Sequence, residues 1–451
     1  MGSKLKRLDL SGSLLAMGGT QGLSTRGAGD FSHKGLIAGF RKKDWEVKTM
    51  TMDRKALEAL YRGLSPKTKG RVKQAVDLIT ETKARGGRVA AVLGSGPNLH
   101  EGVTTLVAEL IRKGLVDGVS TSSAVINHEM AGTLEKVKRI DGAALGFDPT
   151  KLASDGRVEV SLLSGRQLSQ IEEEISLDRP LYDRLRRARG KTIIKVAGNM
   201  AYPTGLRTER LAADALKLAK KHGIPFEKMV GYGADPHTMI GAGAERNIPV
   251  LVTVPQLVGG GMVGLAIGDS IPISERCRQI ARLLDSADII IESALALSQE
   301  VHDGPFELFT GHGIWADWSG QWTYSLENKK IIRIDLDPNL ERAWAAERKS
   351  GTVTEAVDKG LPKTKHMKIP FRMEMSGFAR IPGSLPIAGD IGAVWPVLAM
   401  RAADALGVSL DFMSYKQSTP PGEKMREWIV RHVKPVDRQL LFECKPDKKY
   451  A

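Results

Sequence analysis

Residues 88–130 limit the possible folds of this chain more than any other segment does. An apolar run, Val89–Leu93, ends in the small-residue loop Gly94-Ser95-Gly96-Pro97-Asn98, and apolar residues at helical spacing follow it. A second apolar run, 116–119, ends in Thr121-Ser122-Ser123. This order predicts a strand–loop–helix–strand unit. Such loops present backbone N–H groups and hydroxyls where dinucleotide phosphates and riboses can bind, so the segment indicates a nucleotide-dependent enzyme.

The rest of the chain repeats this alternation of short apolar runs and helical stretches. The runs expected to form strands are 89–93, 116–119, 158–163, 193–196, 248–254, 289–291, 331–334 and 386–388. Alternation of this kind favours an α/β fold with a doubly wound, mostly parallel sheet. Ligands bind at the carboxyl ends of strands in such sheets, so the residues just after each run are the first site candidates.

The chain of 451 residues is long enough for one large domain or two ordinary ones. Residues 1–50 are Gly/Ser-rich and basic with little periodicity, and we expect an N-terminal arm that becomes ordered against a partner surface. Residues 51–410 are expected to form the catalytic domain, and 411–451 a C-terminal extension. A polar, Lys-rich connection at 345–370 has a length that is usually functional or flexible.

Charge and cysteine content narrow the class of protein. The formal net charge of +14 fits an anionic partner or a solvated basic surface. The charges are scattered without interleaved aromatic residues, so nucleic acid is not expected as a partner. Cys277 and Cys444 lie too far apart for a disulfide framework or a thiolate metal site, which suits the cytoplasm. No apolar stretch approaches the roughly 20 residues of a membrane span, and no signal-peptide pattern is present.

Two glycine loops are candidates for phosphate binding. Gly94-Ser95-Gly96 departs from the dinucleotide fingerprint because Leu99 stands where the third glycine belongs. The run from Gly259 to Gly264 fits the spacing and follows a predicted strand. It is either a ligand loop or a turn where two backbones approach closely.

Carboxylates follow two later strands. Asp335 and Asp337 come after the run 331–334, and Gly389-Asp390 follows the run 386–388. A carboxylate at a strand end can accept the hydroxyls of a ribose. The alternatives are an Asp-Pro turn at 335–339 and a helix N-cap at Asp390.

Residues 300–322 are the densest in chemical groups. They include His302, His312, Asp317 and three of the seven tryptophans, Trp315, Trp318 and Trp322. Tryptophans beside histidine and aspartate suit a pocket for a cationic or amine substrate. A loop that packs at a subunit interface is the alternative. The two histidines lack a third ligand at helical spacing, so we expect no metal site.

Four stretches resemble one family, the deoxyhypusine synthases. They are LGSGPNLHEGVTTLVAELIRKGLVDGVSTSSA (93–124), NIPVLVTVPQLVGGGMVG (247–264), SGTVTEAVDKGLPK (350–363) and IAGDIGAVWPVLAMRAADAL (387–406). They occur in the family's order and span most of residues 88–406. The resemblance implies a Rossmann-like NAD-binding fold and a homotetramer with active sites across a dimer interface. In that family NAD oxidises a polyamine, and a lysine takes up the aminobutyl group as an imine.

The resemblance also implies the cofactor positions. The residues that match or lie beside them are Ser95, Gly96, Asn98, Thr121, Ser122, Ser123, Asp335, Asp337, Gly389 and Asp390. The catalytic positions depart from the family: its lysine falls on Leu361, and its two substrate carboxylates fall on Gly259 and Gly264. Because a substrate with two ammonium ends needs such carboxylates, the departure indicates a changed substrate.

The resemblance and the residues together predict an NAD-dependent enzyme acting on a small amine or amino acid. Oxidation to an imine would be followed by transfer, elimination or cyclisation. Lys359 or Lys363 would form the imine or move protons. The acid–base candidates are His302, His312 and Asp317, and the substrate-binding candidates are His128, Glu129, Gly260, Gly261, Trp315, Trp318 and Trp322. An enzyme of the group that deaminates and cyclises ornithine with NAD, and a non-catalytic binding or assembly protein, are the alternatives.

Overall fold

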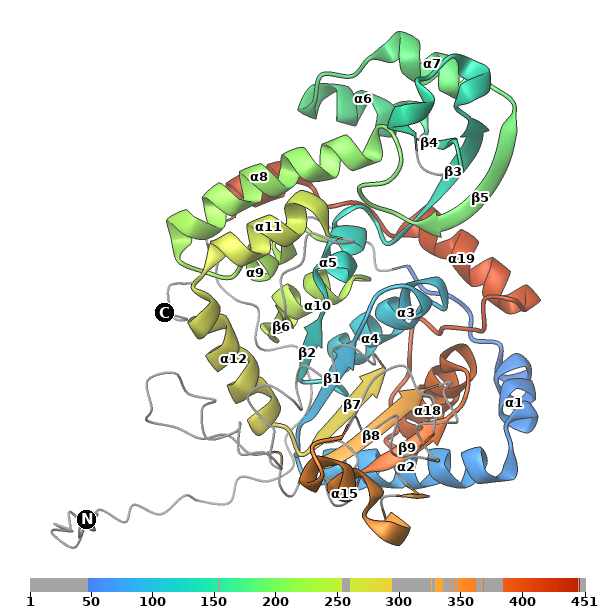
Figure 1. Cartoon of the computed structure of the whole chain (residues 1–451), viewed down its shortest axis with the longest axis vertical. Coiled ribbons are helices and arrows are strands. Elements are labelled where there is room, and N and C mark those ends of the chain that lie inside the picture. Colours follow the sequence, from blue (N-terminus) through green and yellow to red (C-terminus); the bar gives the residue numbers. More distant parts are fainter. Residues whose placement is uncertain are drawn as a thin grey trace, which may run out of the picture. The chain divides into compact units, whose positions relative to one another are not determined.

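The computed structural model describes residues 48–152, 155–253, 260–293, 329–335, 348–361 and 384–444, together with 326, 342, 345–346, 368 and 446. All of them lie in one compact unit, Leu36–Ala451 (Figure 1). Its strands are β1 (Val89–Leu93), β2 (Gly118–Thr121), β3 (Leu134–Asp141), β4 (Arg157–Ser161), β5 (Gly190–Val196), β6 (Val250–Val252), β7 (Ile289–Ser293), β8 (Lys330–Asp335) and β9 (Leu385–Ala388). Its helices are α1 (Arg54–Gly63), α2 (Pro66–Ala84), α3 (Pro97–His100), α4 (Val103–Arg112), α5 (Ser123–Met130), α6 (Gly165–Glu174), α7 (Arg179–Arg187), α8 (Thr204–His222), α9 (Phe226–Gly231), α10 (Met239–Arg246), α11 (Gly261–Ser270), α12 (Ile273–Asp285), α15 (Thr352–Asp358), α18 (Ile391–Ala405), α19 (Pro420–His432) and α20 (Arg438–Glu443), with two short 3-10 helices at Ala143–Leu145 and Pro149–Lys151.

A six-stranded parallel sheet forms the centre of this unit. Its strand order is β6-β2-β1-β7-β8-β9, and every neighbouring pair runs parallel. All five residues of β1 are buried, as expected for an apolar strand covered on both faces. The chain moves outward from β1 through β2 to β6, and outward on the other side from β7 through β8 to β9. This is the strand order of the Rossmann fold, and it confirms the predicted doubly wound, mostly parallel sheet.

A second, three-stranded sheet corrects part of the prediction. The runs 158–163 and 193–196 were expected in the parallel sheet, but they form β4 and β5, which pair antiparallel with β3. β3 was not predicted because its apolar residues Leu134, Val137 and Ile140 are spaced three apart, which is a helical spacing. The small sheet has its own core with α6 and α7, formed by Ile140, Val160, Leu168, Tyr182 and Leu185.

Helices pack on the parallel sheet and extend its core. α4 packs against α10 and α18, and α2 contacts α18 and β9. Ser65 accepts a hydrogen bond from the backbone of Thr68 and so begins α2. The part of the chain after residue 410 belongs to the same core, since Phe412, Met413 and Tyr415 are buried in it. None of the described helices combines the length and apolarity needed to cross a membrane.

Candidate functional site

The loop after β1 lies beside the end of β7, where the strand order of the parallel sheet reverses. Asn98 follows β1 and is 2% exposed, and it joins this loop to the end of β7. Its Nδ2 donates to the carbonyl of Gly94 at 3.2 Å and to the carbonyl of Ser293 at 2.7 Å. The Ser293 hydroxyl donates back to Asn98 Oδ1 at 2.7 Å. The predicted cofactor residue Asn98 therefore uses its amide to join the loop after β1 to the end of β7.

The backbone of the first loop is open at Gly96. Gly96 has a φ of 70° and a ψ of −110°, a conformation that L side chains rarely adopt. Among the described residues, and apart from its two chain neighbours, no atom lies within 4 Å of the position that a Cβ would occupy there. Ser95 and Gly96 are half-buried at this edge. A ligand can thus approach the backbone of this loop closely.

Hydroxyl groups tie the neighbouring strand ends together. The Thr121 hydroxyl donates to the carbonyl of Leu93 at 2.7 Å, linking β2 to β1. Ser122 begins α5, and its Oγ accepts from the backbone of Val125 at 3.4 Å. The structure therefore brings the predicted cofactor residues of both loops to one edge of the sheet, with the Thr121 and Ser122 hydroxyls engaged in local contacts.

A cavity of about 600 Å³ opens at the end of β9. Asp390 Oδ1 accepts from the backbone of Gly392 at 2.9 Å, so Asp390 is the N-cap of α18, which was the alternative to the predicted ribose contact. Its other oxygen pairs with Lys416 Nζ at 2.9 Å. Apolar side chains make up much of the wall, and the lining residues are Ala56, Ala59, Leu60, Gly63, Leu64, Ser65, Thr68, Ala388, Gly389, Asp390, Ala393, Tyr415, Lys416, Thr419 and Pro421.

Glu101 connects α3 with this cavity. Its Oε2 accepts from the backbone of Gln417 at 2.6 Å, beside Lys416. Burial raises the pKa of Glu101, the hydrogen bond from Gln417 opposes that rise, and the charge of Asp390 adds to it. The short helix after β1 is thus anchored to the C-terminal segment.

A group of buried charges lies on the small sheet and was missed by the sequence analysis. Lys195 Nζ pairs with Glu159 Oε2 at 2.5 Å, and the Ser161 hydroxyl donates to Glu135 Oε2 at 2.7 Å. Burial raises the pKa of Glu135 to about 7. No motif indicated these residues, since they come from three strands that the sequence does not reveal as neighbours.

His128 on α5 faces the loop that follows β5. Its Nδ1 contacts the Ala197 carbonyl, so Nδ1 holds the proton and Nε2 has the lone pair. Burial lowers the pKa of His128 to about 4, and the nearby charge of Lys195 adds to this effect. At Gly198, with a φ of 135°, a Cβ would lie 3.0 Å from His128 Nδ1. The imidazole is therefore neutral at neutral pH, with a fixed tautomer.

The same loop reaches the predicted glycine run. A Cβ on Gly261, which has a φ of 53°, would lie 2.6 Å from Asn199 Nδ2. Gly260 is the N-cap residue of α11. The loop of Gly198 and Asn199 thus brings the predicted substrate residues His128 and Gly261 together, and the sequence analysis did not include it.

Glu129 points into the protein instead. Its two carboxylate oxygens accept from the backbone of Met239 at 2.9 Å and of Ile240 at 3.1 Å, at the start of α10. Burial raises the pKa of Glu129 to about 8, and these two hydrogen bonds oppose the rise. Its observed contacts are those of a helix cap.

The structure describes only some of the remaining predicted site residues. Lys359 is exposed at the end of α15, and its Nζ pairs with Glu355 at 2.5 Å. Asp335 ends β8 opposite Ala388 of β9. The other predicted residues, Lys363, His302, His312, Asp317, Asp337, Trp315, Trp318 and Trp322, lie outside the described residues. In the part of the chain that the structure describes, no group of three or more His, Cys, Asp or Glu residues could hold a metal ion.

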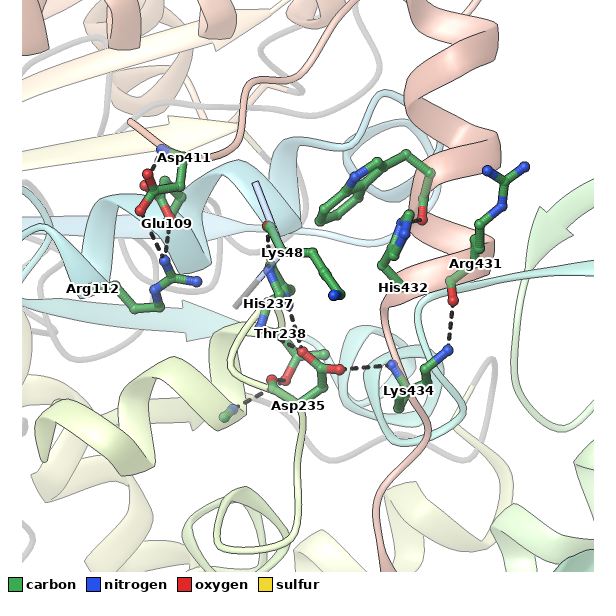
Figure 2. Close-up of polar contacts among 12 residues, drawn as sticks. Lys48, Glu109, Arg112, Asp235, His237, Thr238, Asp411, Arg431, His432 and Lys434 are labelled. Carbon is green, nitrogen blue, oxygen red and sulfur yellow. Dashed lines mark hydrogen bonds and ion pairs between the residues drawn. The ribbon is translucent and has the colours of Figure 1, made fainter. Parts of the chain in front are cut away.

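A second cluster of polar side chains joins three distant segments (Figure 2). His237 Nδ1 lies 2.8 Å from Asp235 Oδ1, and His237 Nε2 lies 3.2 Å from the Lys48 carbonyl. Asp235 Oδ2 accepts from the backbone of Lys434 at 2.9 Å. The indole of Trp428 packs edge-on against His237, with ring centroids 5.3 Å apart. These contacts fasten residue 48 and the C-terminal segment to the loop before α10.

Comparisons with known proteins give low similarity. No protein-family model and no curated protein matches the chain. Among solved structures, a point variant of AgrE in complex with L-arginine is 13% identical, with 80% of this chain and 34% of that chain covered and a TM-score of 0.36. A LOR/SDH protein from Methanococcus maripaludis S2 is 11% identical, with 80% and 74% covered and a TM-score of 0.34. AgrE with ornithine and NAD+ is 13% identical, with 79% and 34% covered and a TM-score of 0.36. The chain spans about a third of the length of AgrE, and we assign no activity from these likenesses.

Proposed function

We propose that this chain binds NAD at the crevice between the ends of β1 and β7 and uses it to oxidise a small amine or amino acid. The main support is the strand order β6-β2-β1-β7-β8-β9, with its reversal point between β1 and β7. Open α/β sheets bind their ligands at this point. The hydrogen bonds between Asn98 and Ser293 join the loop after β1 to the end of β7 at this point.

The side chains around the crevice suit a dinucleotide. The open backbone at Gly96 would face the pyrophosphate, because no Cβ blocks its approach. The largely apolar cavity beside β9 suits a flat ring, and Asp390 and Lys416 would bind hydroxyl groups at its polar end. NAD, when bound, supplies a hydride acceptor.

The substrate would lie on the side of His128 and the loop of Gly198. An ammonium group must lose a proton before hydride can leave the neighbouring carbon. Burial makes the neutral His128 a weak base, so its Nε2 lone pair would accept a hydrogen bond from the amine nitrogen and orient it, while the ammonium proton leaves to solvent. Oxidation then moves one hydride to NAD+ and one further proton from the amine nitrogen to a base, which leaves an imine. Transfer, elimination or cyclisation would follow, as in deoxyhypusine synthases or in enzymes that cyclise ornithine.

Titration with NAD+ tests the proposal directly. The purified chain is expected to bind NAD+ at one site per subunit, measured by isothermal titration. Gly96→Val should weaken binding at least tenfold, because the added side chain blocks the loop. Gly86→Val is the matched control: Gly86 has a φ of 77° and an equally open Cβ position, but it precedes β1 at the other end of the strand. A wild-type chain without NAD+ binding, or equal effects of the two variants, would contradict the proposal.

Borohydride trapping tests the lysine. We propose Lys359 or Lys363 as the imine-forming residue, and a trapped amine should appear on one of them after peptide mapping. Lys359→Arg keeps the pairing with Glu355 but cannot form an imine, and it should abolish any adduct at that position. Trapping elsewhere, or no adduct with any amine tested, would remove both lysines from the mechanism.

A further inference from the structure

We propose that helix α1 is a movable lid over the cavity beside β9, and that exposed ion pairs with α18 hold this lid in place. The inference rests on the proposed function for the identity of the ligand, NAD. It makes the release of that ligand sensitive to ionic strength.

α1 forms one wall of the cavity of about 600 Å³. The lining residues Ala56, Ala59, Leu60 and Gly63 share one face of the helix. Because three of these four residues are alanine or glycine, the wall leaves room that larger side chains would fill. Ala59 and Gly63 are exposed, so the cavity borders solvent along this helix. A movement of α1 would therefore widen or narrow the mouth of the cavity.

Little buried surface holds α1 in place. Of its ten residues only Leu57 is fully buried, whereas twelve of the fifteen residues of α18 are. α1 packs beside α18 (Figure 1). Segments with few buried apolar contacts open locally, at a lower free energy than the whole fold. α1 is therefore suited to open while the sheet stays folded.

Charged groups join another face of α1 to α18, and we call these contacts the latch. Arg54 Nη1 and Nη2 donate to the two carboxylate oxygens of Asp404 at 2.8 and 2.6 Å. Arg401 Nη2 lies 3.1 Å from Glu58 Oε1, and the Arg401 guanidinium carbon lies 3.9 Å from the ring centroid of Tyr61. The side chains of Arg54 and Asp404 are 61% and 43% exposed, so dissolved ions can screen this pair. The latch should weaken as the salt concentration rises.

Both ends of α1 are attached where a lid would pivot. Before the helix, the Asp53 backbone N–H donates to the Tyr415 hydroxyl at 2.7 Å, and Tyr415 itself lines the cavity. After the helix, Leu64 and Ser65 are both extended and separate α1 from α2. Rotation of the backbone in such a short connection lets a helix turn as a unit. α1 can therefore turn away from α18 and stay attached at the cavity.

Hydrogen exchange read by mass spectrometry tests the lid, with and without NAD+. In the wild-type chain, α1 amides should exchange at least about tenfold faster than α18 amides, and NAD+ should slow exchange in α1. Asp404→Asn removes the ion pair with Arg54 and hardly changes the shape of the side chain. Because an exposed ion pair shifts an equilibrium by up to about fivefold, the variant should speed α1 exchange by about threefold to fivefold. Exchange in α18 should stay unchanged, and NAD+ should dissociate faster by a similar factor.

Salt and matched variants separate the latch from a general loosening of the fold. Raising NaCl from about 0.05 M to about 1 M should speed α1 exchange relative to α18 in the wild type, and by less in Asp404→Asn, which lacks the screened pair. Arg54→Gln removes the same pair from the other side and should reproduce both effects. The control Asp77→Asn removes an exposed ion pair with Lys73 inside α2, and it should change neither α1 exchange nor NAD+ release.

The possible outcomes keep the lid and the cofactor apart. Equal acceleration of α1 and α18 in Asp404→Asn, unchanged α1 exchange in that variant, or an unchanged dissociation rate of NAD+ would overturn the lid. Binding of NAD+ that leaves α1 exchange unaltered would also overturn it. A chain that binds no NAD+ but shows the α1-selective effects of salt and Asp404→Asn would support the lid and remove the proposed cofactor from the cavity.

Discussion

Replacing Asn98 gives the sharpest test of how the crevice is held. Asn98→Ala removes three buried hydrogen bonds, two donated to the carbonyls of Gly94 and Ser293 and one accepted from the Ser293 hydroxyl. A buried hydrogen bond contributes about 1 kcal/mol, so the free energy of unfolding should fall by about 3 kcal/mol. Ser293→Ala removes only one of the three bonds and should cost about 1 kcal/mol.

Asn98→Asp separates hydrogen bonding from shape. The aspartate has almost the same size, but it places a carboxylate oxygen where the amide nitrogen donates to the Ser293 carbonyl at 2.7 Å. Because two oxygens then face each other in a buried place, the variant should be at least as unstable as Asn98→Ala. The double variant of Asn98 and Ser293 should show a coupling of about 1 kcal/mol, the value of their shared bond.

Urea unfolding followed by circular dichroism measures these differences, and NAD+ titration follows their effect on the crevice. We expect Asn98→Ala to weaken NAD+ binding as well, since the loop after β1 loses its connection to the end of β7. The proposed role of the Asn98 hydrogen bonds would be refuted if the free energy of unfolding of Asn98→Ala lay within about 0.5 kcal/mol of the wild type, or if Asn98→Asp were as stable as the wild type.

Three further predictions concern charged groups. Burial raises the pKa of Glu135 from 4.5 to about 7, so the folded chain binds more protons than the unfolded chain between these pH values. The free energy of unfolding should therefore fall by on the order of 3 kcal/mol as the pH rises from 4.5 to 7. Glu135→Gln should flatten this slope in unfolding measured across pH; an unchanged slope would contradict the assignment. Asp235→Ala should lower the free energy of unfolding by about 3 kcal/mol and speed hydrogen exchange at the Lys434 amide, because Asp235 accepts a hydrogen bond from that amide. Unchanged exchange protection of the Lys434 amide would contradict this prediction. Lys416→Met removes a half-exposed ion pair, so stability should change by less than about 1 kcal/mol while NAD+ affinity falls severalfold; unchanged affinity would exclude Lys416 from the cofactor site.

The parallel sheet could be predicted because its central strands are buried on both faces. Runs such as 89–93 and 289–291 are then continuously apolar. The N-cap at Asp390 was visible as one of two roles, because an aspartate between an apolar run and a helical pattern can begin the helix or contact a ribose. The antiparallel pairing of the small sheet was not visible, because two of its strands were expected in the parallel sheet and the apolar residues of β3 have a helical spacing.

The direction in which each side chain points could not be predicted from sequence patterns. His128 and Glu129 are neighbours on α5, yet one contacts the loop after β5 and the other caps α10. Successive residues on a helix point about 100° apart, so a motif position alone does not say which of them faces a site. Asn98 shows the same limit: the resemblance implied a cofactor contact, and the amide is engaged with the protein itself.

The end of α3 explains why the C-terminal segment matters for the site. Residues after 410 lie around both His100 and Glu101: Gln417 donates to Glu101, Lys416 pairs with Asp390, and the charge of Arg426 acts on both. A Cβ added at Gly102 would lie only 2.5 Å from Met425 Sδ, so the start of α4 packs directly on α19. Because the loop after β1 and α19 are in such close contact, a shift of α19 would move His100 and Glu101 together. The C-terminal segment thus couples the cavity beside β9 to the group around Lys195, whose charge acts on His128, and these are the two sides on which the proposed cofactor and substrate would bind.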